Sequence, residues 1–245
     1  MILFRLLADY GVHTMRFSYF SQVDASSLID KAYSELRRAI IAGELRAGQK
    51  LRIRELCQSF EIGPTPMREA LSRLVSEGLV ANQSHRGFYL PELSFEEVLD
   101  IIEQRAVLEC AALKTAMKLN DPEWIEDVRS AFHLLRLVEE RWQASRRSFW
   151  TEWVQQNRLL HETIASGALS YWNAKFLSIL YDQSERYTMA CPPSGFVYES
   201  CITNHERILK GIMAGDADLA VQSMHDYVMS LKDAAADAMK ARETI

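Results

Sequence analysis

The chain has 245 residues, of which 48% are hydrophobic and 25% are charged, and its formal net charge at pH 7 is −5. This composition is ordinary for a globular protein that is long enough for two domains with separate cores. No apolar run approaches the ~20 residues of a membrane span, so we expect a cytoplasmic protein without a membrane segment.

The N-terminal segment and the cysteines carry no predicted function. Residues 1–25 lack the basic head, long apolar core and cleavage site of a signal peptide, so we expect a poorly ordered leader, with Met15 as a possible true start. The four cysteines are scattered and form no C-x-x-C pair, which is typical of reduced thiols. A redox switch between Cys191 and Cys201 is an alternative.

The first domain is predicted over residues 26–91 and begins with two amphipathic helices. The first covers residues 27–42 and is ended by Gly43 at a C-cap position. The second is shorter, over residues 54–60, and leads into a tight turn at residues 61–63.

A third helix follows that turn and runs to about residue 77. Pro64 and Pro66 are tolerated in its first turn, where the backbone N–H groups have no intrahelical partner to lose. Its buried stripe consists of Met67, Ala70, Leu71, Leu74 and Val75. The polar residues expected on its outer face are Thr65, Arg68 and Ser72.

Two short strands are predicted next, over residues 79–82 and 88–90, around a turn that carries His85 and Arg86. Helix, turn, helix and hairpin in this order are typical of a winged helix-turn-helix. In that fold the N-terminal turn of the second helix of the motif usually contacts base edges in DNA.

The charge balance differs between the two parts of the chain. Residues 26–91 hold ten Lys and Arg against seven Asp and Glu, whereas residues 92–245 hold sixteen against twenty-four. A surplus of three positive charges is small for a lone DNA-binding module. We therefore expect two copies on one DNA site, and hence a homodimer.

Beyond Pro91 the sequence predicts six amphipathic helices and no strand, which indicates an all-α bundle over residues 92–245. Ser94 and Glu97 have the pattern of a capping box at the start of the first helix. The expected helices span about 94–118, 122–143, 149–165, 170–189, 196–214 and 216–240. The tryptophans expected in the core or at a subunit interface are Trp142, Trp150, Trp153 and Trp172.

Three histidines of the predicted bundle could meet in its interior. Asn157 and His161 lie four residues apart on one helix face, and His205 and His225 lie near the middle of the last two helices. Three imidazoles and one oxygen ligand suit zinc, nickel or another first-row divalent ion. Spacing alone leaves open that each histidine is simply hydrogen-bonded or exposed.

A resemblance to the DNA-binding domain of the GntR family of bacterial transcription regulators is carried by RELCQSFEIGPTPMREALSRLVSEGLV, with IIAGELRAGQKL before it and RGFYL after it. The resemblance implies that Arg54 and Arg68 occupy the positions of DNA-contacting arginines. Pro64 stands where members usually have another arginine, so the operator sequence is expected to differ from the common one. The DNA-binding residues that we expect are Arg54, Thr65, Arg68, Ser72, His85 and Arg86.

The second part of the chain resembles the ligand-binding FCD domain of the FadR-type subgroup of that family, through EQRAVLE, NRLLHETIASG and NHERILKGIMAGDADLAVQSMH. Metal-binding members use an Asp and a His four residues apart and two later histidines. The resemblance places Asn157, His161, His205 and His225 at these positions. Asparagine binds a divalent cation less strongly than a carboxylate does, so the ion is either held more weakly or absent.

The same resemblance implies an effector site. Arg105 and Glu109 match an Arg and a Glu of the family motif, and Arg105 is expected to hold an effector carboxylate bidentately. A local salt bridge from Arg105 to Glu109 or Glu103 is the alternative. Arg186 is a second candidate anion contact. The habit of the subgroup implies a small carboxylic or sugar acid as effector.

These observations favour a homodimeric transcription regulator whose operator affinity changes when a small organic acid binds in the helical domain at a divalent metal site. One alternative is a metal-dependent enzyme that acts on a small organic acid, although no H-E-x-x-H arrangement supplies a general base. Another is a winged helix that contacts proteins. Outward arginines at Arg54, Arg68 and Arg86 favour DNA.

Overall fold

The computed structural model describes residues 27–83, 87–142, 149–190 and 195–243, and it confirms a mainly helical chain with a small β-hairpin. The first unit contains α3 (Leu28–Ile41), α4 (Ile53–Phe60), α5 (Pro64–Ser76), β1 (Ala81–Gln83) and β2 (Gly87–Tyr89). The second unit is a bundle of α6 (Phe95–Leu119), α7 (Pro122–Trp142), α8 (Trp150–Ser166), α9 (Tyr171–Ala190), α10 (Gly195–Ala214) and α11 (Ala217–Glu243). The predicted leader, Met15 and Cys191 lie outside the described residues.

Capping and turn residues set the path of the helix-turn-helix. The hydroxyl of Ser27 accepts a hydrogen bond from the backbone N–H of Asp30 (3.2 Å) and so begins α3. Glu61 ends α4 in the left-handed conformation, with φ at 55°, which turns the chain sharply. Gly63 is the N-cap of α5 and Pro64 occupies its first position, in agreement with the prediction from the two prolines.

The hairpin is shorter than the sequence predicts. β1 and β2 pair antiparallel, with Ala81 opposite Tyr89. Leu79 and Val80 are buried and their backbone N–H groups bond to the carbonyl of Leu74 at the end of α5 (3.1 and 3.2 Å), so they do not join the ladder. The predicted wing tip, with His85 and Arg86, lies outside the described residues.

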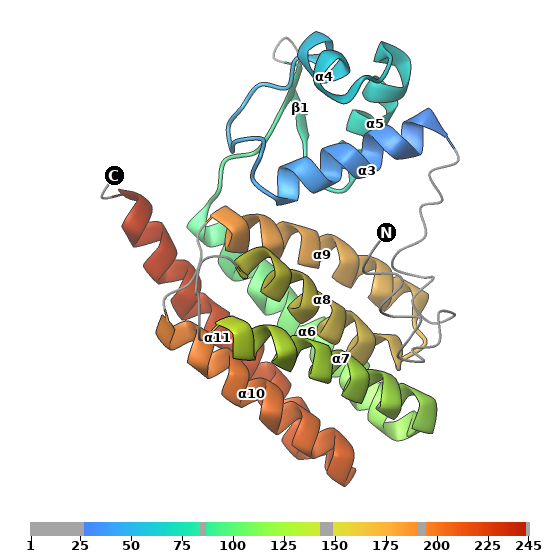
Figure 1. The fold of residues 1–245 in the computed structure, drawn as a ribbon, viewed down its shortest axis with the longest axis vertical. Coiled ribbons are helices and arrows are strands. Elements are labelled where there is room, and N and C mark those ends of the chain that lie inside the picture. Colours follow the sequence, from blue (N-terminus) through green and yellow to red (C-terminus); the bar gives the residue numbers. More distant parts are fainter. Residues whose placement is uncertain (1–26, 84–86, 143–148, 191–194, 244–245) are drawn as a thin grey trace.

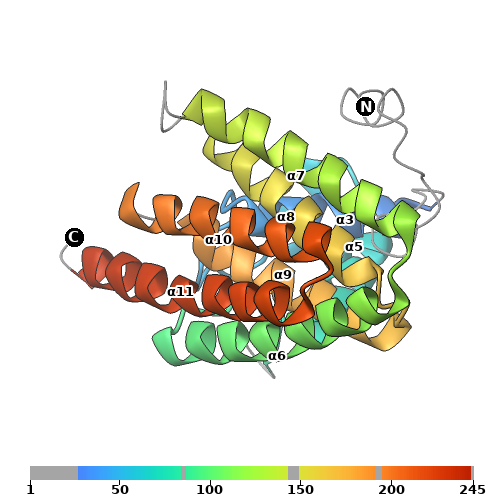
Figure 2. The same ribbon diagram turned by 90° about the horizontal axis from the view of Figure 1, so that it is seen from below.

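Each unit has an apolar core of its own. The core of the first unit is formed mainly by α3 and α5 and includes Leu36, Ile40, Met67, Leu71 and Leu74. The core of the bundle includes Ile102, Leu113, Trp124, Leu135, Trp153, Met224 and Val228. Figure 2 shows α11 lying between α6 and α10, two helices that it contacts extensively. Across the described residues, no helix has the length and apolarity that crossing a lipid bilayer requires.

The start of α6 keeps only half of the predicted capping box. The hydroxyl of Ser94 accepts a hydrogen bond from the backbone N–H of Glu97 (3.3 Å). The carboxylate of Glu97, however, accepts from the hydroxyl of Tyr187 on α9 and does not return to Ser94. The backbone N–H of Ser94 donates instead to the Tyr187 oxygen (3.0 Å). Tyr187 therefore fixes the beginning of the bundle to α9.

The two units meet along α3 and α9, which lie against each other in Figure 1. Arg37 of α3 forms a two-pronged ion pair with Asp182 of α9, in which Nε lies 2.5 Å from Oδ2. The side-chain amide of Gln183 donates to the backbone carbonyl of Glu77, just beyond α5 (3.1 Å). Two consecutive residues of α9 thus hold the first unit at two points, one in α3 and one just beyond α5.

Candidate functional site

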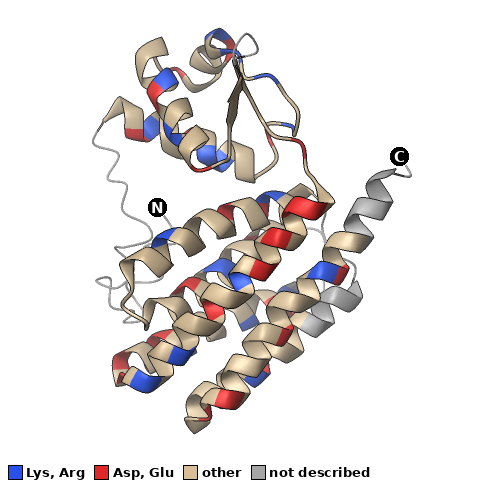
Figure 3. Cartoon of the chain, turned by 180° about the vertical axis from the view of Figure 1, so that it is seen from behind, with Lys and Arg blue, Asp and Glu red and all other residues tan. Residues whose placement is uncertain are grey.

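The outer face of the first unit carries four of the predicted DNA-binding residues. Arg54 of α4 and Thr65, Arg68 and Ser72 of α5 are all exposed. The hydroxyl of Ser72 donates to the backbone carbonyl of Arg68 (2.9 Å). Neither Arg54 nor Arg68 has a side-chain hydrogen bond or ion pair with a described residue, so both guanidinium groups can bind an external anion. Figure 3 marks the Lys and Arg positions of the first unit in blue, along its helices and loops.

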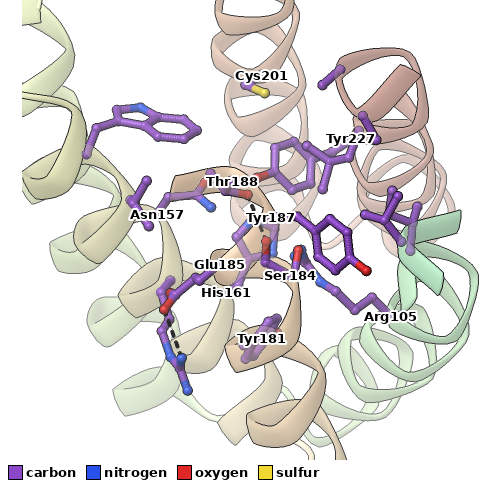
Figure 4. A pocket seen from close by; sticks show the side chains of 18 of the residues that line it. Arg105, Asn157, His161, Tyr181, Ser184, Glu185, Tyr187, Thr188, Cys201 and Tyr227 are labelled. Carbon is purple, nitrogen blue, oxygen red and sulfur yellow. Dashed lines mark hydrogen bonds and ion pairs between the residues drawn. The ribbon is translucent and has the colours of Figure 1, made fainter. Parts of the chain in front are cut away.

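The bundle contains a pocket of about 80 Å³ between α6, α8, α9, α10 and α11 (Figure 4). Its aromatic residues are Trp150, Trp153, Tyr181, Tyr187 and Tyr227. Its polar and charged residues include Arg105, Asn157, Arg158, His161, Ser184 and Glu185. An apolar wall with a few convergent polar groups is the usual form of a site for a small organic molecule.

A chain of buried polar groups runs from α6 to α10 along this pocket. Nε of Arg105 donates to Oε1 of Glu109 (2.9 Å) and Nη1 donates to the hydroxyl of Ser184 (2.7 Å). Oε2 of Glu109 lies 2.6 Å from Nδ1 of His161. Nε2 of His161 in turn lies 3.2 Å from Nε2 of His205.

The protons of this chain can be assigned from its chemistry. Burial alone would raise the pKa of Glu109, but Arg105 and His161 hold that pKa below its usual value, so Nδ1 of His161 donates to a carboxylate. Burial, assisted by His161, holds the pKa of His205 well below its usual value, so His205 is neutral. When the Nε2–H group of His205 donates to Nε2 of His161, Nδ1 of His205 carries a lone pair. Within this chain of polar groups, that lone pair alone lacks a hydrogen-bond partner among the described residues. The opposite assignment would bury an unpaired N–H donor, which is less favourable.

The structure corrects the fourth member of the predicted histidine cluster. The side chain of His225 is 51% exposed on the outside of α11. Tyr227 faces the cluster instead, with its ring centroid 4.5 Å from that of His161 and 4.4 Å from that of His205. Its hydroxyl donates to Oδ1 of Asn157 (3.0 Å). Two residues along an α-helix turn the side-chain direction by about 200°, so His225 and Tyr227 point to opposite sides.

A sequence signal for Tyr227 exists, although histidine spacing does not reveal it. Met224, Tyr227, Val228 and Leu231 recur at steps of three and four residues, which is the apolar stripe of α11. Met224 and Val228 are fully buried. Because His225 falls off that stripe, helical phase alone would have placed it outside the bundle.

The residues that meet at this point do not fit a divalent cation. The cluster offers the imidazoles of His161 and His205, the neutral amide oxygen of Asn157 and the phenol of Tyr227, whose pKa burial raises. Among the described residues, no group of three or more His, Cys, Asp and Glu is placed to hold a metal ion. The expected zinc or nickel site therefore lacks a third imidazole and a carboxylate facing the shared point.

The two arginines that were expected to bind the effector occupy different surroundings. Arg105 lines the pocket, but it is also paired with Glu109, which is the predicted local alternative. Arg186 is only 6% exposed and lies outside the pocket lining, with Nη2 3.4 Å from Oε2 of Glu97. Arg186 therefore belongs to the contact between α9 and the start of α6.

Arg158, which follows Asn157 on α8, also lines the pocket, although the sequence did not predict it as a site residue. Its Nε donates to Glu162 (2.7 Å), and its Nη1 donates to Asp182 (2.6 Å) and to Glu185 (3.2 Å). Burial alone would lower the pKa of Arg158, but the three carboxylates raise it well above its usual value. Burial also raises the pKa of Glu185 to about 6, against the opposing effect of Arg158. The spacing of Arg158 and Glu162 predicts only a local pair, so the meeting with α9 was not visible in the sequence.

Comparison with known proteins gives two domain matches. Residues 28–90 match the model of bacterial regulatory proteins of the gntR family, and residues 100–229 match that of the FCD domain. The HTH-type transcriptional regulator BphR of Paraburkholderia xenovorans is 35% identical over 83% of each chain. The HTH-type transcriptional repressor GlaR of Escherichia coli is 29% identical over 81% of this chain and 91% of its own.

Solved structures support the same fold. McbR/YncC of E. coli superposes with a TM-score of 0.70 at 20% identity, covering 86% of this chain and 98% of the other. A GntR-type protein of Rhodococcus sp. RHA1 gives a TM-score of 0.71 at 22% identity, with the same coverage. The matched domains and relatives are transcription regulators and not enzymes, which argues against the metal-dependent enzyme.

The first prediction concerns metal content. Because the cluster lacks two of the required donors, the purified protein should hold far less than one divalent ion per chain, and zinc or nickel should leave its melting temperature unchanged. Replacing both Asn157→Asp and Tyr227→His supplies the missing donors and should create metal binding, measured by elemental analysis. His225→Ala is the matched control. One ion per chain in the unmodified protein, lost in His161→Ala, would contradict the assignment.

The second prediction concerns pH. Because folding favours the neutral form of Glu185, its contribution to stability is full below about pH 4.5 and is lost as the pH rises through about 6. Glu185→Gln should therefore reduce the fall in the free energy of unfolding between pH 5 and pH 7.5 by roughly 1–2 kcal/mol, measured by urea denaturation. The exposed Glu126→Gln should not change this fall. Parallel pH profiles for Glu185→Gln and the unmodified protein would exclude the effect.

Proposed function

The chain belongs to the GntR family of bacterial regulatory proteins, in the FadR-type subgroup that carries an FCD domain, and we propose that it binds a palindromic operator as a homodimer under the control of a small organic acid. The observation that carries this proposal is the combination of an unpaired, outward arginine on α5 with a polar pocket inside the bundle. Operator DNA and an effector in one chain also imply that it acts in the cytoplasm.

The exposed residues of α5 support its role in reading DNA. A recognition helix contacts base edges with its N-terminal residues, and here that turn presents Thr65 and Arg68. Arg54 is placed on the preceding helix, where it can bind the phosphate backbone. His85 and Arg86 remain predicted wing contacts. With Pro64 in place of the usual arginine, Thr65 and Arg68 carry more of the recognition.

The pocket supports an organic acid with an apolar body as effector. Arg105 and Arg158 bring guanidinium groups to its wall, and guanidinium is the side chain that best matches a carboxylate. Trp150 and Trp153 stack with ring centroids 5.2 Å apart, and their rings provide an apolar surface that the carbon skeleton of a ligand can contact. The histidine cluster does not fit a metal ion that could bind the ligand's carboxylate. We therefore expect arginine to bind that carboxylate.

An exposed aromatic surface supports the homodimer. Tyr171, Trp172 and Phe176 on α9 are 55%, 60% and 49% exposed and contact one another through their rings. The side-chain amide of Asn173 donates to the carbonyl of Leu108 (3.1 Å) and so places this part of α9 beside α6. Aromatic residues are enriched at subunit interfaces, and a second copy of this chain would bury them. Of the two roles expected for Trp172, core and subunit interface, the proposal assigns it the interface role.

The third prediction tests the reading helix. On a palindrome selected from random DNA, Arg68→Ala should weaken binding by about tenfold or more, because one charged contact to base or phosphate is lost. Arg129→Ala, which removes an exposed arginine of α7, is the charge-matched control and should leave the affinity nearly unchanged. Equal affinities of the two variants in a mobility-shift assay would reject α5 as the reader.

The fourth prediction tests the dimer surface. Trp172→Glu should shift the protein toward monomers in sedimentation velocity, because a carboxylate would be buried at the aromatic contact. Operator affinity should fall as the dimer dissociates, since a single DNA-reading unit carries little positive charge. Leu137→Glu, at a partly exposed leucine of α7, is the control. A Trp172→Glu protein that stays dimeric would place the interface elsewhere.

A further inference from the structure

The effector pocket and the junction between the two units share one wall. A second hollow, of about 710 Å³, lies between α3 on one side and α8 and α9 on the other. Val154, Arg158 and Glu185 line both this cleft and the pocket inside the bundle. The side chain of Arg158 is 15% exposed, so it lies at the boundary of the two spaces. A ligand in the pocket can therefore touch a residue that also faces the first unit.

Asp182 connects that wall to the first unit. Oδ1 of Asp182 lies 2.6 Å from Nη1 of Arg158 and also accepts from Nη2 of Arg37. Its other oxygen lies 2.5 Å from Nε of Arg37. The Asp182 side chain is only 7% exposed, so the carboxylate itself is shielded from solvent, whereas the Arg37 side chain is 29% exposed. Arg158 thus orients the same carboxylate that holds α3.

The cluster around Arg158 already contains more negative than positive groups. Two guanidiniums, Arg37 and Arg158, face three carboxylates, Glu162, Asp182 and Glu185. Asp182 and Glu185 compete for the same Nη1 atom of Arg158, at 2.6 and 3.2 Å. A further carboxylate cannot be added to this buried group without displacing one of them, because unpaired buried charges are strongly unfavourable.

We propose that Arg158 is the anion contact of the effector and that its release of Asp182 carries effector binding to Arg37 and the DNA-reading unit. This inference rests on the proposed function and specifies its regulation. When a ligand carboxylate takes Nη1 of Arg158, Asp182 keeps only its pair with Arg37 and loses the contact that fixes its position. The first unit is then held less rigidly on α9, and the separation of two reading helices in a dimer is less well defined. The effector therefore binds more tightly to the state in which the first unit is held less rigidly on α9. A difference in effector affinity between two states is what allosteric coupling requires.

A double-mutant cycle tests the link without any ligand. Operator dissociation constants are measured for Arg37→Gln, Asp182→Asn and their combination, in the unmodified protein and in an Arg158→Gln background. The two substitutions should be strongly non-additive in the unmodified protein and clearly less so in the Arg158→Gln background, where Asp182 still contacts Arg37 but is no longer held in position. An Arg129→Gln background should retain the full coupling. Should Arg158→Gln not fold, Arg158→Lys keeps the charge but has a single nitrogen in place of the Nε and Nη1 atoms that bond Glu162 and Asp182, and it should reduce the coupling.

Undiminished coupling between Arg37 and Asp182 in the Arg158 variants would overturn the proposal. The failure of the proposed function would look different, because the unmodified protein would then select no DNA sequence at all. Circular dichroism of each variant confirms that a change in affinity does not reflect unfolding.

A second measurement uses benzoate as the probe and its neutral relative benzamide as the control. Benzoate should raise the melting temperature and weaken operator binding by at least about fivefold, and benzamide should do neither. Asp182→Asn should retain the benzoate-induced rise in melting temperature but lose the effect on DNA. Arg158→Gln should lose both. Absence of a benzoate effect on the unmodified protein, or a full DNA response in Asp182→Asn, would overturn the proposal.

Discussion

One buried carboxylate, that of Asp182, joins the two units of this protein. It accepts from Arg37 of the helix-turn-helix unit and from Arg158, which lines the pocket inside the bundle, and its own side chain is only 7% exposed. Buried ion pairs contribute little net stability, because desolvation offsets much of their attraction, but removing one partner is strongly unfavourable. The Asp182 carboxylate is therefore well suited to transmit ligand binding, because an anion that competes for Arg158 changes the ion pair between Asp182 and Arg37.

Among the described residues, the polar centre of the bundle does not have the donor set of a divalent metal site. Arg105, Glu109, His161 and His205 form a hydrogen-bonded series. Tyr227 packs its ring against both imidazoles and donates to Asn157. These contacts satisfy most of the buried donors with protein groups alone. Two neutral side chains, the amide and the phenol, stand where charged or imidazole donors would be needed for a cation. The positive charge available to an acidic effector is therefore that of the arginines on the pocket wall.

Most of the architecture could be predicted from the sequence, because helical periodicity, the first-turn prolines of α5 and the N-cap at Ser94 are local signals. The order of the reading unit and the six bundle helices is confirmed. The site was predicted less completely. His225 was chosen for its residue type, although its helical phase places it outside, and Tyr227 was overlooked. Arg158 and Asp182 are 24 residues apart on different helices, so only packing of α8 on α9 reveals their pairing.

The most direct test of the account is the distance between the two units in solution. Genetically encoded spin labels at Gln58 of α4 and Gln104 of α6, both exposed, report this distance by pulsed electron paramagnetic resonance. When labelled chains are diluted with unlabelled ones, so that a dimer holds one labelled copy, the account predicts one narrow distance distribution for the otherwise unmodified protein and a clearly broader one for Asp182→Asn. The same narrow distribution in both proteins would contradict the claim that Asp182 holds the DNA-reading unit on the bundle.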